Sequence, residues 1–246
     1  MKKVSRKKVL ASCLAILLIG GCIVKKVNSG VTRPTLAPAR GRELQLILDA
    51  GHGGEDGGAV SLSGVAESGI NLSIVLKIDQ LLGFYGICPY LIRESDISLH
   101  EPEADTLRKK KVSDLKNRVT MIENTENAVV ISIHQNTFPN QAYHGAQVFY
   151  REEGESIVLA ELLQKTLRSN VDQENERAPA KISDSIYLMQ HISCPAVLVE
   201  CGFLSNPAEE QKLLTAEYQT KLAVCVAATW IEYIENQGGN LQTPMI

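Results

Sequence analysis

Apolar residues follow two repeating patterns along the chain, which predict strands that alternate with helices. Continuous apolar runs predict buried strands at Leu44–Asp49, Ile87–Arg93, Ala128–Ile133, Gly145–Tyr150, Ile186–Met189 and Ala196–Val199. Apolar residues at helical spacing predict helices at Glu67–Tyr85, Lys111–Asn124, Ser156–Val171, Pro207–Leu214 and Ala216–Asn236. This alternation favours an α/β fold, which we expect to be a single layered domain with a mostly parallel or mixed β-sheet flanked by helices.

The first residues of the chain carry a different pattern. Five basic residues among the first eight precede an apolar stretch from Val9 to about Val24, as in an export signal. That stretch is shorter than the roughly 20 apolar residues that suit a transmembrane helix. The segment Ile19–Cys22 also resembles a bacterial lipoprotein cleavage box, with Cys22 as the lipidated residue. A cleaved signal peptide, an uncleaved membrane anchor and a lipid anchor all remain open for residues 1–26.

The rest of the chain divides into three predicted parts. Residues 27–42 contain two prolines and two glycines and are predicted to be a linker, 43–236 to form the folded domain, and 237–246 to form a disordered tail. The net charge of -3 gives no basic surface for nucleic acid, so we expect no nucleic-acid partner. The four cysteines beyond the signal show no C-x-x-C spacing, which favours free thiols over a disulfide framework or a thiolate zinc site.

Three predicted strands lead into ionisable side chains at the same end. Leu44–Asp49 precedes the glycine-rich loop that contains His52, Ala128–Ile133 ends in His134, and Ala196–Val199 ends in Glu200. Ligands bind outside the carboxyl ends of the strands in open α/β sheets, so we expect one shared site there. The loop lacks the spacing of nucleotide-binding glycine motifs, and its glycines are expected to let the backbone turn tightly around the histidine.

The residues His52, Glu67 and His134 are candidate ligands of a catalytic zinc ion. Such an ion takes three nitrogen or carboxylate ligands and keeps a fourth position for water. Each residue also has a simpler interpretation. A single histidine is more often hydrogen-bonded in a core or loop, and an acidic residue in the first turn of a helix interacts favourably with the helix dipole. The two histidines His144 and His191 are weaker candidates for the same role.

Glu200 is the candidate general base and acid of this site. A carboxylate beside a metal can take a proton from water and pass it to a leaving amine, which is the chemistry of amide hydrolysis. The alternative is a buried salt bridge with Arg93 or Arg118.

Four blocks of the sequence are similar to the zinc-dependent N-acetylmuramoyl-L-alanine amidases of the Amidase_3 type, and they occur in the order of that family. The blocks are Asp49–Ala59, Glu67 with Ile70–Leu72, Ser132–Asn136 and Val199–Asn206. The resemblance extends from about Leu44 to Tyr233. It implies that His52, Glu67 and His134 bind Zn²⁺ and that Glu200 is the catalytic carboxylate. It also implies that the 43–236 domain hydrolyses the amide between N-acetylmuramic acid and L-alanine in peptidoglycan, which removes the stem peptide.

Within that family, the single-domain layout and the stretches Leu107–Arg118, Gly145–Tyr150 and Ile186–Met189 resemble the CwlD-type spore-cortex amidases. This implies export to the outer face of a bacterial membrane or the spore intermembrane region. It also implies a role in cortex maturation, through the muramic-δ-lactam that germination needs. Thr137 stands where the family commonly has alanine.

The expected partners are peptidoglycan glycan strands and stem peptides, the membrane through the N-terminal segment, and an accessory exported protein. The last expectation arises because the chain shows no wall-binding repeat. Two other functions stay open at this point. One is a zinc peptidase that cuts within stem peptides, and the other is a non-catalytic peptidoglycan-binding module.

Overall fold

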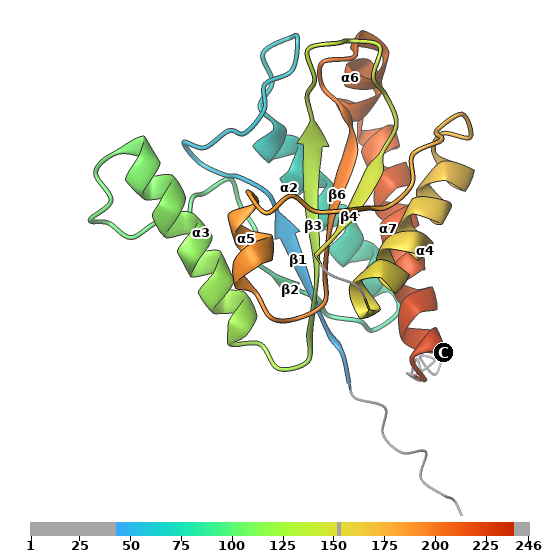
Figure 1. Ribbon diagram of the computed structural model, residues 1–246, viewed down its shortest axis with the longest axis horizontal. Coiled ribbons are helices and arrows are strands. Elements are labelled where there is room, and N and C mark those ends of the chain that lie inside the picture. The colour runs from blue at the N-terminus through green and yellow to red at the C-terminus, as the bar shows by residue number, and fades with distance from the viewer. Residues whose placement is uncertain (1–42, 152–153, 239–246) are drawn as a thin grey trace, which may run out of the picture. The chain divides into compact units, whose positions relative to one another are not determined.

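A six-stranded mixed β-sheet forms the centre of the computed structural model, which describes residues 43–151 and 154–238 (Figure 1). The strand order is β2-β1-β3-β6-β4-β5, with β1 Gln45–Ala50, β2 Tyr90–Leu91, β3 Ala128–Asn136, β4 Gln147–Tyr150, β5 Ala180–Lys181 and β6 Ala196–Phe203. Strands β2, β1, β3 and β6 are parallel, whereas β4 pairs antiparallel with β6. This confirms the predicted α/β fold and its single mixed-sheet domain. The segments predicted as signal and linker lie outside the described residues, as does most of the predicted tail.

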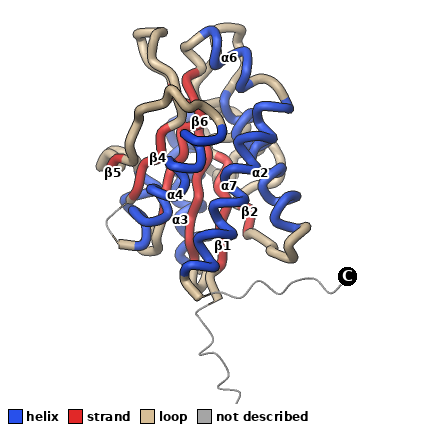
Figure 2. The backbone as a smooth tube through the Cα atoms, turned by 90° about the vertical axis from the view of Figure 1, so that its right-hand side faces the viewer, coloured by secondary structure: helices blue, strands red, loops and turns tan. Residues whose placement is uncertain are grey.

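Helices cover both faces of the sheet. One face packs against α2 (Glu67–Gly83), α4 (Glu155–Asn170) and α7 (Ala216–Asn236), and Figure 2 shows α2 and α7 together on one side of the strands. The other face packs against α3 (Leu107–Glu123) and the short α5 (Tyr187–His191). The helix α6 (Pro207–Leu213) follows β6. No helix in the described part of the chain is both long and apolar enough to span a bilayer.

The alternation of side chains along β6 decides on which face of the sheet Glu200 lies. Val197, Val199 and Cys201 belong to the core beneath α2, α4 and α7, whereas Ala196 and Leu198 belong to the core beneath α3 and α5. Successive side chains of a strand point to opposite faces. Glu200 therefore lies on the α3 and α5 face of the sheet.

Two central strands are longer than the apolar pattern predicted. Strand β3 continues through His134 to Asn136, and β6 continues through Glu200 to Phe203. The pairing of β3 with β6 shifts by one residue directly after Glu200, as in a β-bulge. Bulges often occur beside active sites, where they redirect side chains. His134 and Glu200 are thus held within strands and do not lie beyond their ends.

The predicted strand at Ile186–Met189 is wrong, because Ile186 is the N-cap of the helix α5 and the other three residues form its first turn. Leu188 and Met189 are adjacent in the sequence and are buried in the same core. In a strand, successive side chains would point to opposite faces of the sheet. Tyr187 stacks on His191, four residues later, with ring centroids 3.8 Å apart, as helical spacing permits. A short apolar run does not distinguish a buried strand from a buried turn of helix.

Candidate active site

Two buried arginines fix the backbone of the glycine-rich loop that follows β1. Arg93 donates from Nε to the carbonyl of Ala50 (2.8 Å) and from Nη2 to that of Gly51 (3.1 Å). Arg118 donates from Nη2 to the carbonyl of His52 (2.7 Å). His52 itself has a φ of 63°, in the left-handed region that residues other than glycine rarely occupy. The arginines therefore hold a backbone conformation that the loop does not favour by itself, and such strain is typical of functional sites.

The charge of Arg118 is balanced by two carboxylates on its own face of the sheet. Its Nη1 lies 2.6 Å from Asp49 and its Nε lies 2.7 Å from Asp114. Asp49 also accepts a hydrogen bond from Ser132 Oγ at 2.6 Å. Burial alone would raise the pKa of Asp49, but the charge of Arg118 and the Ser132 hydrogen bond hold it below its ordinary value. Arg118 therefore pairs with these aspartates and Arg93 lies 3.9 Å from Asp96, so the predicted alternative of a salt bridge from either arginine to Glu200 is wrong.

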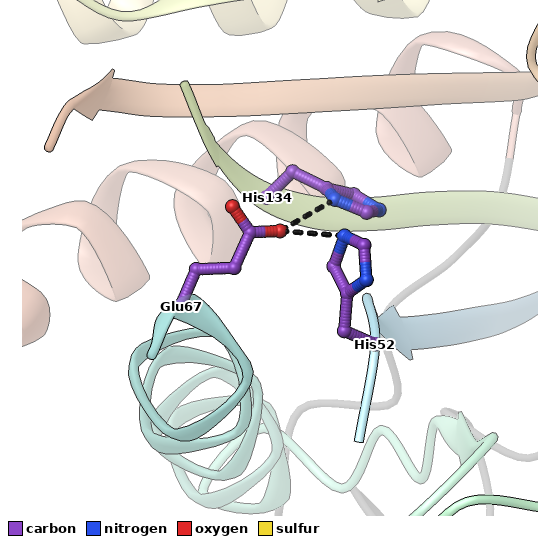
Figure 3. A group of neighbouring side chains, drawn as sticks. All are labelled: His52, Glu67 and His134. Atoms are coloured by element: carbon purple, nitrogen blue, oxygen red, sulfur yellow. Dashed lines mark hydrogen bonds and ion pairs between the residues drawn. The ribbon is translucent and has the colours of Figure 1, made fainter. Parts of the chain in front are cut away.

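The three predicted ligands converge from three different elements (Figure 3). His52 comes from the glycine-rich loop, Glu67 from the first turn of α2, and His134 from β3. Glu67 Oε1 lies 2.7 Å from His52 Nε2 and 3.3 Å from His134 Nδ1. One ligand atom from each residue lies within 4.8 Å of the others. The residues thus form one cluster of two nitrogen atoms and one oxygen atom that could hold a metal ion.

The electrostatics of this cluster suit a cation. Burial opposes a positive charge on His52, yet its hydrogen bonds to Asp56 and Glu67 raise its pKa to about 9. Burial also opposes ionisation of Glu67, but hydrogen bonds to His134 and His52 lower its pKa to about 2. The two carboxylates thus hold a proton on the imidazole between them, and a metal ion can take the place of that proton. Ligands about 2.0–2.1 Å from a tetrahedral zinc ion lie about 3.3 Å from one another, which these side chains can reach with small movements.

Two glycines leave the space that the cluster occupies. A Cβ atom added to Gly51 would lie 2.2 Å from the ring of His134. One added to Gly58 would lie 2.5 Å from Glu67 Cγ and 2.6 Å from His52 Cδ2. Gly58 also has a φ of 69°, which glycine adopts without strain. The glycine-rich loop therefore serves close approach to the histidines, as predicted.

Glu200 lies next to the cluster and forms no salt bridge within residues 43–151 and 154–238. It pairs with His134 in the register of β3 and β6, and its Oε2 atom is buried with no hydrogen-bond partner among the described residues. Burial raises the pKa of Glu200 to about 7; the Glu67 carboxylate adds to this rise, while His134 and His52 act against it. A carboxyl group with this pKa can both accept and donate a proton near neutral pH.

The structure also reveals a supporting residue that sequence reasoning did not identify. Asp56 Oδ2 lies 3.0 Å from His52 Nδ1, so it orients the ring and leaves Nε2 directed at Glu67. A carboxylate behind a metal-binding histidine is a common arrangement. In the sequence, the four-residue spacing between His52 and Asp56 within a glycine-rich loop could have indicated this role of Asp56. The weaker candidates lie elsewhere, His144 beside Asp172 and His191 bonded to its own helix.

Most of the folded domain matches a known protein family. Residues 46–231 match the family model described as N-acetylmuramoyl-L-alanine amidase. The chain belongs to this family. Its activity is therefore hydrolysis of the N-acetylmuramoyl-L-alanine amide in peptidoglycan, which decides against the predicted alternative of a non-catalytic binding module.

Individual relatives agree with this assignment. The germination-specific N-acetylmuramoyl-L-alanine amidase of Bacillus subtilis (strain 168) is 35% identical over 212 residues, which cover 86% of this chain and 87% of that protein. The amidase AmiA of Escherichia coli (strain K12) is 27% identical over 93% of this chain and 91% of its own. A solved structure of the CwlD amidase from Clostridioides difficile, in complex with the GerS lipoprotein, superposes with a TM-score of 0.75. It is 39% identical, and the match covers 78% of this chain and 99% of that one.

Proposed function

We propose that this amidase is zinc-dependent, with His52, Glu67 and His134 as the metal ligands and Glu200 as the general base and acid. The observation that carries the proposal is the convergence of two histidines and a carboxylate beside a buried carboxyl oxygen that has no partner among the described residues. When bound, zinc supplies a Lewis acid that polarises the amide carbonyl and lowers the pKa of water.

The protein's own residues then handle the proton. Glu200 accepts it from the attacking water through Oε2 and donates it to the L-alanine nitrogen as the carbon–nitrogen bond breaks. Asp56 keeps the His52 ring in a fixed orientation during these steps, and Arg93 and Arg118 keep the loop backbone in place. The products are peptide-free muramic acid and a stem peptide with a free L-alanine amino terminus.

The test compares the zinc-loaded protein with its Glu200→Gln variant on purified peptidoglycan, with the products identified by mass spectrometry. We expect stem peptides that begin with L-alanine from the wild type. The variant should be slower by about 10²- to 10⁴-fold, the usual contribution of general acid–base catalysis, with unchanged zinc content. A His134→Ala variant should lose zinc as well as activity. Release of single amino acids or internal fragments would instead favour the zinc peptidase alternative, and equal turnover by Glu200→Gln would remove that residue from the mechanism.

We also propose that the enzyme acts in spore cortex maturation and contributes to muramic-δ-lactam formation. The support is its similarity to the germination-specific amidase of Bacillus subtilis and to the CwlD amidase of Clostridioides difficile. Because peptidoglycan lies outside the cytoplasmic membrane, this role requires export through the N-terminal segment. Deletion of the gene should yield spores whose cortex lacks muramic-δ-lactam in muropeptide analysis, and a cortex of unchanged composition would refute the role.

Similarity to the CwlD amidase also supports the proposal of an accessory exported protein. The similar CwlD structure holds the amidase in complex with a lipoprotein. We expect the purified, zinc-loaded protein to digest cortex peptidoglycan more slowly alone than with a membrane fraction of sporulating cells. Equal rates would show that no such protein is needed.

A further inference from the structure

Three polar side chains form a row across neighbouring strands of the sheet. His134 of β3 pairs with Glu200 of β6, and Glu200 pairs with Gln147 of β4. Paired residues on adjacent strands point to the same face, with Cα atoms about 5 Å apart. The row therefore runs from the proposed zinc ligands, through the proposed acid and base, to Gln147.

Arg177 lies at the far end of this row and is held from several sides. Its Nη1 donates to Gln147 Oε1 at 3.0 Å, and its Nε donates to the carbonyl of His144 at 2.9 Å. Its Cζ atom lies 4.7 Å from the ring centroid of Phe203 and 5.7 Å from that of Tyr143. Two hydrogen bonds and two aromatic rings thus fix the guanidinium plane, so little side-chain entropy remains to be lost when a ligand binds.

The fixed guanidinium has no counterion in the part of the chain that the structure describes. No carboxylate among residues 43–151 and 154–238 forms an ion pair with Arg177, whereas Arg118 pairs with both Asp49 and Asp114. Its Nη2 group forms no hydrogen bond within the same residues. A positioned guanidinium with free donors is suited to binding a carboxylate, because its fork matches carboxylate geometry.

The direction of the row indicates which part of the substrate would reach this arginine. Glu200 must lie beside the nitrogen that leaves, so the stem peptide extends from the Glu200 side of the site. Two extended residues span at most about 7 Å, and neighbouring strands lie about 4.8 Å apart. A carboxylate on the residue after L-alanine can therefore lie one to two strand spacings beyond Glu200, where Arg177 is found.

We propose that Arg177 determines specificity by binding a carboxylate of the stem peptide, on the residue that follows the L-alanine released by the cut. The proposal rests on the proposed role of Glu200, because that role sets the direction of the leaving peptide. The enzyme would accordingly prefer a stem peptide with a free carboxyl group at this residue over one in which the group is a carboxamide.

The test uses two synthetic disaccharide peptides that differ at this single group. In both, L-alanine is followed by a glutamyl residue, whose free carboxyl group is left as the acid in one and converted to the carboxamide in the other. The measured quantity is the ratio of kcat/KM for the acid to kcat/KM for the amide, in the zinc-loaded full-length protein. We expect a ratio of at least about ten for the wild type, since a hydrogen bond to a charged group is worth that factor or more.

Variants of Arg177 distinguish a role in binding the substrate carboxylate from a role in supporting the structure. Arg177→Gln should bring the ratio to about one, and Arg177→Lys, which keeps the charge but not the fork, should give an intermediate ratio. Arg168→Gln is the matched control, since Arg168 is exposed on α4 at the other face of the sheet, and it should keep the wild-type ratio. A wild-type ratio near one would overturn the proposal, as would an Arg177→Gln variant that slows on both substrates and keeps the ratio. A wild type that cleaves neither peptide would instead overturn the proposed function, and this inference with it.

Discussion

A single methyl group at Gly51 should disable the site while leaving the fold intact. The added Cβ would lie 2.2 Å from both Cε1 and Nε2 of His134, whereas ordinary contacts begin at 3.4 Å. Either the backbone of Gly51 or the imidazole ring must therefore move by about 1 Å.

The backbone of Gly51 is not free to move. Its N–H donates to the carbonyl of Ile133 at 3.1 Å, which joins it to β3. Its carbonyl accepts hydrogen bonds from Asn71 Nδ2 at 3.2 Å and from Arg93 Nη2 at 3.1 Å. The ring of His134 must therefore be displaced. A misplacement of about 1 Å at a catalytic group costs on the order of 10²-fold in rate, and we expect Gly51→Ala to lose about that much activity.

The assay measures zinc content by mass spectrometry, turnover on peptidoglycan and the melting temperature of each variant. The matched control is Gly69→Ala on α2, where no atom lies within 4 Å of the added Cβ. This control should be fully active, and more stable by about 0.5–1 kcal/mol, because alanine is favoured over glycine within helices. A Gly51→Ala protein that binds one zinc ion and turns over at the wild-type rate would refute the reasoning.

Two further predictions concern carboxylates behind the site. Asp56→Asn removes the charge that orients His52, and we expect zinc affinity to fall by about 10- to 100-fold in a competitive chelator titration; unchanged affinity would contradict this role. Asp49→Asn breaks the buried pair with Arg118 and should lower the free energy of unfolding by about 3 kcal/mol at pH 7 in urea titrations. Because the pKa of Asp49 is depressed in the folded state, its contribution is present above pH 3.8 and is lost as the pH falls. The difference between wild type and variant should therefore shrink below pH 3.8, and a constant difference would contradict the assignment.

The fold and the cluster of three candidate ligands could be predicted because local signals pointed to them. The apolar runs that became β1, β3 and β6 are buried on both faces and stand out in the sequence. His52 and His134 each lie at or just beyond a run of this kind, and Glu67 begins a helix with a clear periodic pattern. Because β1 and β3 are parallel neighbours, His134 and the loop that carries His52 lie at the same edge of the sheet.

Other features depend on contacts between distant residues and left no local signal. Arg177 contacts His144 and Gln147, which precede it by 33 and 30 residues, from a stretch with no periodic pattern. The continuation of β6 past Glu200 was missed because a charged residue and a glycine interrupt the apolar run at the bulge. In both cases the tertiary pairing, and not the local sequence preference, decides the structure.

The buried charges around Arg118 are best understood as a positioning device. Burying an ion pair contributes little net stability, and an apolar side chain of similar size could fill the same volume. Such a replacement would, however, leave the carbonyl of His52 without the donor that now holds it, and the carbonyl of Ala50 with Arg93 as its remaining side-chain donor. The left-handed conformation of His52 would then lose its support, and with it the direction of the ring towards Glu67. Helix α3, which contributes none of the proposed ligands, is therefore as necessary to the geometry of the site as the elements that carry them.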